Sequence, residues 1–89
     1  MSYKIYYSKK AVKEIPFLKS AHLDKTVKKL IDILKDNPYQ NPPPFEKLVG
    51  NLQGLYSRRI NLQHRLVYDV REDDKAVMIF SMWTHYGDN

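Results

Sequence analysis

The 89 residues of this chain include no cysteine and no long hydrophobic run. Without cysteine the chain can form neither a disulfide bond nor a thiolate metal site, and such a composition suits the reducing cytoplasm. No stretch approaches the roughly 20 apolar residues that a membrane-spanning helix needs, and residues 1–15 lack the apolar run of a signal peptide. We therefore expect a cytoplasmic protein that is used as made and does not enter a membrane.

Glycine motifs and metal-ligand motifs are also absent. The 3 glycines form neither a phosphate-binding loop nor a dinucleotide fingerprint, and the chain has no HExxH sequence. The histidines, His22, His64 and His85, are not spaced like metal ligands. A Ser-His-Asp set is available, as in most chains, but no local motif supports it. We expect no cofactor and no bound metal.

Positive charge is what the chain has in excess. Lys and Arg number 15 against 10 Asp and Glu, which gives a net charge of +5. That balance favours nucleic acid or an acidic protein as a partner. With 43% hydrophobic and 28% charged residues, the composition is typical of a globular protein, and this length leaves room for one core. We expect a single domain over residues 1–89.

The first half of the chain predicts one strand and two helices. Residues 3–7 (YKIYY) are aromatic and β-branched and predict a short strand. Ser8 then suits the N-cap of a helix, which Pro16 should kink or end. Apolar residues recur at helical spacing over residues 22–37 and predict a second helix. The prolines at 42–44 predict an extended connector.

The second half predicts three strands. Residues 56–61, 64–70 and 76–86 alternate with a period of two, and short connections make them an antiparallel meander. The element order is therefore β-α-α-β-β-β. We expect an α+β fold in which an antiparallel sheet packs on two N-terminal helices.

Alternation along these strands predicts which side chains share a face. The apolar sides should pack on the helices; they comprise Ile60, Leu66, Tyr68, Val70, Met78, Phe80 and Met82. Arg59, Arg65 and His85 would then look out from the open face. Arg58 would keep its stem on apolar surface and its charge in water, so replacing it should leave the chemistry nearly intact.

Arginine, histidine and a carboxylate can together cleave an RNA phosphodiester without a metal ion. A general base takes the proton of the 2′-hydroxyl group, and a guanidinium group stabilises the charge on the phosphorane. A histidine then protonates the departing 5′-oxygen. Glu46, which follows the proline-rich connector, is the candidate carboxylate. Ordinary solvated side chains would explain the same residues, and the pattern alone leaves both interpretations open.

A longer motif favours the RNA-cleavage interpretation. Residues 46–70, EKLVGNLQGLYSRRINLQHRLVYDV, together with THY at 84–86, strongly resemble the Txe/YoeB family of bacterial toxin–antitoxin toxins within the RelE superfamily. The resemblance implies a RelE-like, microbial-RNase-like fold. It also implies the toxin component of a type II toxin–antitoxin system, a ribosome-dependent mRNA endonuclease (mRNA interferase) that inhibits translation.

The resemblance assigns roles to individual residues. It implies Glu46 as general base, Arg65 as stabiliser of the transition state and His85 as general acid. It implies that Tyr86 positions the substrate and that Arg59 holds phosphate.

Two departures from the family pattern concern positively charged and terminal residues. Where many members carry a lysine before the first motif glycine, this chain has Val49, and Lys47 is the basic residue that we expect to reach RNA. Residues 87–89 follow the His-Tyr pair at which many members end.

The resemblance also implies partners. These are a cognate acidic antitoxin of the YefM/Axe kind, whose C-terminal segment folds over the toxin, and the ribosome with its mRNA. Operator DNA would be bound only through the toxin–antitoxin complex, and a homodimer is a further expectation. Two alternatives stay open: a non-catalytic toxin of the same RelE/ParE fold, and a plain RNA-binding module in which Trp83 and Tyr86 stack on bases.

Overall fold

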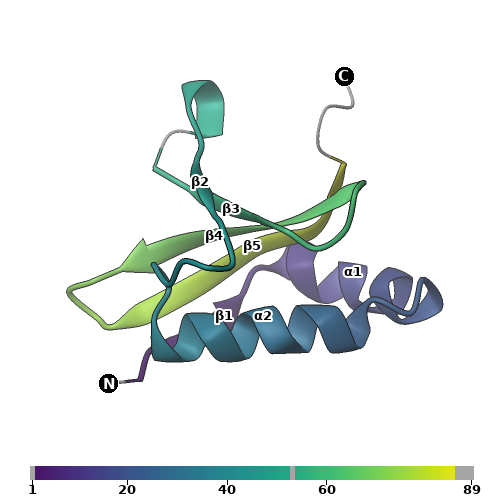
Figure 1. Ribbon diagram of the computed structural model, residues 1–89, viewed down its shortest axis with the longest axis horizontal. Coiled ribbons are helices and arrows are strands. Elements are labelled where there is room, and N and C mark those ends of the chain that lie inside the picture. Colours follow the sequence, from purple (N-terminus) through teal and green to yellow (C-terminus); the bar gives the residue numbers. More distant parts are fainter. Residues whose placement is uncertain (1, 53, 86–89) are drawn as a thin grey trace.

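The computed structural model describes residues 2–52 and 54–85. Two helices lie against one face of a five-stranded sheet, and the segment that carries β2 projects from the sheet on the side away from the helices (Figure 1). The elements in chain order are β1 (Lys4–Tyr7), α1 (Lys9–Ser20), α2 (Asp24–Asp36), β2 (Glu46–Lys47), the 3-10 turn η1 (Gly50–Leu52), β3 (Tyr56–Arg59), β4 (His64–Arg71) and β5 (Ala76–His85). The expected α+β fold is confirmed.

The sheet has the strand order β1-β5-β4-β3-β2. Strands β3, β4 and β5 form the expected antiparallel meander, but β1 pairs with β5 in parallel, so the sheet is mixed and not wholly antiparallel. Two helices follow β1, so no tight turn fixes its direction relative to the other strands. The local sequence pattern therefore does not show that β1 pairs with β5. Strand β2 was also missed, because its two residues are too few to show a period.

Helix α1 begins as its sequence predicts and ends later. The Oγ of Ser8 accepts a hydrogen bond from the backbone N–H of Ala11 at 3.0 Å, and the same hydroxyl donates to the carbonyl of Phe80 in β5 at 2.6 Å. Of the two effects expected of Pro16, a kink or an end, the end does not occur, because α1 continues to Ser20. Pro16 lies on the exposed side of the helix, where water can satisfy the carbonyl that loses its partner.

Helix α2 supplies one wall of the core, as its period predicts. Its apolar face, Val27, Leu30, Ile31 and Leu34, is buried. These side chains pack with Leu18 of α1 and with the apolar residues of the sheet face that the helices cover. Within the described part of the chain, neither helix has both the length and the apolar character that crossing a membrane requires.

The face assignment along β5 is wrong over most of the strand. Val77 and Ile79 are fully buried against the helices, whereas Met78 and Phe80, which we expected there, are 36% and 40% exposed. Only Met82 lies in the core as predicted. Residues 76–80 are all apolar, so their pattern has no phase from which to choose a face.

A β-bulge explains why Met82 returns to the core. Tyr68 of β4 pairs with Ile79, and its neighbour Val67 pairs with Ser81. The residue of β5 between Ile79 and Ser81 therefore has no paired residue in β4. An extra residue of this kind switches the faces of all that follow it. A second register shift lies between Arg65 and Val67.

A carboxylate from α1 satisfies the backbone where β5 is irregular. Oε1 of Glu14 accepts a hydrogen bond from the N–H of Met82 at 2.6 Å, and Glu14 is only 7% exposed. The bond ties the first helix to the irregular part of β5, and it removes an unpaired amide from the interior.

We predict that Glu14→Ala lowers the free energy of unfolding by about 1–3 kcal/mol, because it leaves the Met82 amide buried and unpaired. Glu14→Gln should lose less, since its side-chain carbonyl still accepts the bond. Urea unfolding followed by circular dichroism measures both, with the exposed Lys13→Ala as control. Equal stabilities for all three variants would contradict the role assigned to Glu14.

Candidate active site

Three strands bring the candidate residues to the sheet face away from the helices. Glu46 of β2 pairs with Ser57 of β3, and Arg59 of β3 pairs with Arg65 of β4. Directly paired residues of antiparallel strands point to the same side, and so do alternate residues of one strand. Glu46, Ser57, Arg59 and Arg65 therefore share one face, as expected for the two arginines.

Glu46 and Ser57 both accept hydrogen bonds from Arg65. Its Nη2 donates to Oε1 of Glu46 at 2.8 Å, and its Nε donates to the hydroxyl of Ser57 at 2.6 Å. Arg65 is 4% exposed, whereas the side chain of Glu46 is 52% exposed. The prediction of the face is correct, but the expected open surface is wrong: the guanidinium group is buried, and the carboxylate reaches solvent.

Glu46 and Arg65 lie at a small pocket of about 170 Å³. Its lining residues are Pro44, Phe45, Glu46, Arg59 and Arg65. Arg59 is exposed on its rim. The pocket thus combines one accessible carboxylate with two guanidinium groups, one buried and one solvated. An anionic group of the size of a phosphate would meet positive charge at both positions.

Lys47 does not join this pocket. It pairs with Tyr56, and because it follows Glu46 directly in β2, its side chain points to the opposite side of the strand. Lys47 is exposed there. The structure therefore separates the two residues that the motif places together.

The described backbone of β5 reaches the site at Thr84 and His85. The backbone of Thr84 pairs with Arg65 and that of His85 with His64, so β5 ends beside the arginine. The side chain of His85 and the whole of Tyr86 lie outside the described residues, and their assigned roles stay predictions.

Trp83 is a packing residue. Its ring stacks on that of His64 with centroids 3.9 Å apart, and it lies 5.8 Å from the ring of Phe17 in α1. The side chain is partly buried against the core. These contacts remove the support that Trp83 gave to a base-stacking RNA-binding module.

Sequence reasoning missed two neighbours of the site. Ser57 shares a face with Arg59, two positions later, and its hydroxyl group binds Arg65; a small hydroxyl residue at that spacing was the available signal. For Arg58 the expectation was wrong. It lies off the site face, as predicted, but its exposure is 0% and its guanidinium group binds protein carbonyls. The proline-rich segment supplies those carbonyls, and no strand pattern reveals what covers a strand.

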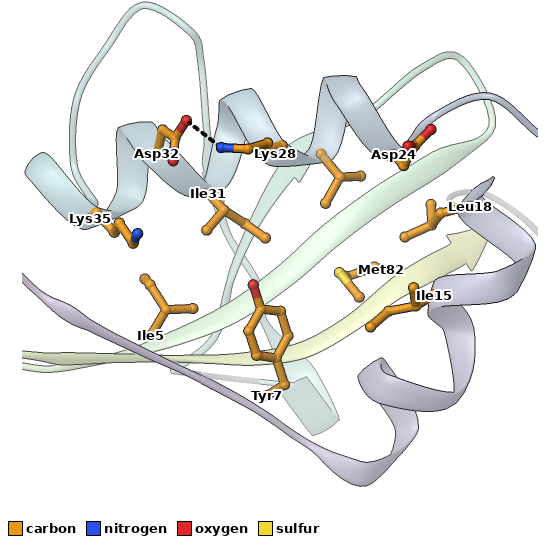
Figure 2. Close-up of a pocket in the computed structure, with 11 residues that line it drawn as sticks. Ile5, Tyr7, Ile15, Leu18, Asp24, Lys28, Ile31, Asp32, Lys35 and Met82 are labelled. Carbon is orange, nitrogen blue, oxygen red and sulfur yellow. Dashed lines mark ion pairs between the residues drawn. The ribbon is translucent and has the colours of Figure 1, made fainter.

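A cavity larger than the arginine pocket lies on the other side of the sheet, between the helices and β1 (Figure 2). Its volume is about 490 Å³. Tyr7 points its hydroxyl group into it, and burial, followed by the negative charge of Asp32, raises the pKa of Tyr7. Asp32 also pairs with Lys28 at 3.6 Å on the rim. The apolar wall and the balanced charges of the rim distinguish this cavity from the arginine pocket.

A model of the YoeB-like toxin of bacterial type II toxin-antitoxin systems matches residues 7–86. Toxin YoeB of Escherichia coli strain K12 is 40% identical over 63 residues, which cover 67% of this chain and 73% of that protein.

Solved structures show the same fold. A YoeB/ParE toxin from Agrobacterium tumefaciens matches with a TM-score of 0.83 at 26% identity, over 93% of this chain and 99% of that one. A YoeB-YefM complex from Staphylococcus aureus matches with a TM-score of 0.79 at 32% identity, over 97% and 100%. YoeB from the same organism, solved as a dimer, has a TM-score of 0.78 at the same identity and coverage.

The fold is that of the YoeB- and RelE-type toxins. The chain belongs to the YoeB-like toxin family of type II toxin–antitoxin systems, and the resemblance seen in its 46–70 motif is confirmed.

We predict that Ser57→Ala speeds the exchange of the Arg65 Nε–H with solvent, because this donor loses its acceptor in a buried site. Ser57→Thr, which keeps the hydroxyl group, is the matched control. The side-chain resonance of Arg65 in nitrogen–proton NMR spectra reports the exchange directly. Unchanged exchange in Ser57→Ala would show that the 2.6 Å contact does not hold Arg65.

Proposed function

We propose that this single-domain toxin is a ribosome-dependent mRNA endonuclease that inhibits translation. The observation that carries the proposal is the pocket in which the accessible carboxylate of Glu46 lies 2.8 Å from the buried guanidinium group of Arg65, with Arg59 on the rim. Membership of the YoeB-like family supports it, as does the net charge of +5, which suits an RNA substrate.

Glu46 and Arg65 divide the first step between them. The carboxylate takes the proton of a 2′-hydroxyl group, whose oxygen attacks the adjacent phosphorus. Arg65 donates to the oxygens on which negative charge builds, and its bonds to Glu46 and Ser57 hold it ready before the substrate arrives. The nucleophile comes from the RNA itself, so the step requires no metal-bound water and no cofactor.

The remaining roles complete the reaction. The 5′-oxygen leaves as its bond to phosphorus breaks, and His85 gives it a proton, so that a 2′,3′-cyclic phosphate and a 5′-hydroxyl end result. Tyr86 positions the substrate and Arg59 holds a phosphate. Lys47, which the structure places off the pocket, contacts RNA outside it.

The proposal extends to partners. A YoeB-YefM complex is among the similar solved structures, and we propose a cognate acidic antitoxin of that kind here, attracted by the positive surface. The S. aureus YoeB dimer supports self-association. The toxin–antitoxin complex, and not the toxin alone, would bind operator DNA, and the toxin would act on cytoplasmic ribosomes.

A non-catalytic toxin of the same fold is the alternative. It would require neither an accessible carboxylate nor a preorganised arginine, and the Glu46–Arg65 pair favours the nuclease.

We predict that the purified protein cleaves mRNA on programmed ribosomes and that Arg65→Ala lowers the single-turnover rate by about 10²–10³. Arg65→Lys should rescue poorly, because an ammonium group lacks the planar fork. Glu46→Gln and His85→Gln, which keep shape but remove proton transfer, should each lower the rate by roughly 10²–10⁴. Tyr86→Phe should lower it less.

The control for this series is Lys13→Ala, at an exposed position of α1, together with a urea unfolding curve for every variant. Cleavage by Glu46→Gln at the wild-type rate would remove the general base from the mechanism. Failure of the wild-type protein to cut ribosome-bound mRNA would reject the proposed function itself.

We predict that a YefM-type antitoxin suppresses cleavage and that its acidic segment slows amide hydrogen exchange in β2 and β3, around the Arg59–Arg65 pocket. Binding should weaken as salt rises, since charge attraction steers it. Hydrogen-exchange mass spectrometry with and without the antitoxin provides the measurement. Protection confined to α1 and α2 would place the inhibitory contact on the wrong face.

A further inference from the structure

Arg58 is a buried cation that the catalytic proposal does not use. Its exposure is 0%, and among the ion pairs of residues 2–52 and 54–85 it has no carboxylate partner. Removing a guanidinium group from water is unfavourable unless other polar groups replace the water. A buried arginine in such a small core therefore needs a physical reason.

Carbonyl groups of one loop surround this side chain. Nη1 donates to the carbonyl of Pro43 at 2.6 Å, and Nη2 donates to those of Pro38 at 3.0 Å and Gln40 at 2.9 Å. Nε donates to the hydroxyl of Tyr68 at 3.2 Å, and that hydroxyl in turn donates to the Pro38 carbonyl at 3.0 Å. Arg58 thus binds three points along one connector.

The composition of the connector explains why it needs this donor. Residues 38–45 read PYQNPPPF, and proline has no backbone N–H. A segment with so few backbone donors cannot pair all of its own carbonyls, yet buried carbonyls need partners. A guanidinium group carries five N–H donors in a fixed plane and meets several carbonyls at once, which a lysine ammonium group cannot do in the same geometry.

The same guanidinium group contacts the residue before Glu46. Its Cζ lies 5.0 Å from the centre of the Phe45 ring, and that ring also packs edge-on against Tyr56 at 5.8 Å. Phe45 and Glu46 are joined by one peptide bond, so their Cα atoms are about 3.8 Å apart. A shift of Phe45 therefore moves Glu46 away from Arg65.

We propose that Arg58 is a positioning residue, which fixes the loop of residues 38–45 and thereby sets the Glu46 carboxylate against Arg65. Strand β3 performs both tasks: Ser57 and Arg59 serve the pocket on one face, and Arg58 holds the loop from the other. The expected effect of Arg58 on the cleavage rate rests on the proposed RNA cleavage. Its expected effect on the position of Glu46 rests only on the contacts of Arg58.

The kinetic test is a double-mutant cycle. Arg58→Met should lower the single-turnover rate on ribosomes by about 10–10²-fold, the effect expected when a catalytic group moves by about 1 Å. In the Glu46→Gln background the same substitution should lower the rate less than about 3-fold further, because the group that it positions is already inactive. Arg58→Lys should rescue poorly.

The matched control is Leu18→Ala, a buried residue of α1 far from the loop. It should lower stability to urea without changing the cleavage rate of the folded protein. Whatever fold-change it causes in that rate should be the same in the Glu46→Gln background. An Arg58→Met effect that persists in full in that background, or that only equals the effect of Leu18→Ala, would overturn the positioning role.

A second measurement does not depend on activity. Arg58→Met should speed hydrogen exchange at the amides of Glu46 and Lys47 and at the Nε–H of Arg65 more than Leu18→Ala does. If the wild-type protein does not cleave RNA but this difference appears, the proposed function fails and the positioning of Glu46 stands. Equal exchange in the two variants would reject the positioning itself.

Discussion

The opposite orientation of adjacent side chains in β3 is the constraint on which the site depends. Two successive arginines point to opposite faces of the sheet. Arg59 lines the pocket, and Arg58 enters the covered side, where the loop carbonyls bind it. A shift of β3 by one residue would turn each arginine to the opposite face of the sheet, so the register of this four-residue strand governs the whole arrangement.

The two buried guanidinium groups are stabilised by different partners. Arg65 has the carboxylate of Glu46 and a hydroxyl group, whereas Arg58 has neutral carbonyls, a hydroxyl group and the face of an aromatic ring. Bonds to charged groups are the stronger kind, but Glu46 is half exposed and solvent screens it. The loop carbonyls that bind Arg58 are neutral, so the contact adds no negative charge near the pocket. Such a contact suits a structural role. The carboxylate that holds Arg65 stays accessible, which suits chemistry.

The helix side of the sheet shows a comparable use of buried polar groups. Glu14 binds the backbone of β5 near the register shifts, and Ser8 binds the carbonyl of Phe80 from the start of α1. Two side-chain bonds to the backbone of β5 therefore help to fix α1 on the sheet. The irregular strand that results ends beside Arg65, because Thr84 is its partner.

The sequence by itself determined both helices, every strand except β2, the meander and the membership of the family. The period of α2, the Ser8 cap and the alternation of β4 are local properties of the chain, and local physics sets them. The Glu46, Arg59 and Arg65 positions followed from the motif and the alternation, and the structure brings these three together. The motif places Lys47 next to Glu46, but the two side chains point to opposite sides of the two-residue strand β2.

Only the tertiary structure decided the rest. The parallel pairing of β1, the bulges of β5 that expose Met78 and Phe80, and the burial of Arg58 and Arg65 all depend on what packs against a strand. Strand alternation gives the face of a residue, but a cover supplied by a segment 15–20 residues earlier in the chain leaves no trace in that pattern. The expectation that the charge of Arg58 lies in water is wrong, because contacts between residues distant in the chain bring the loop that replaces the water.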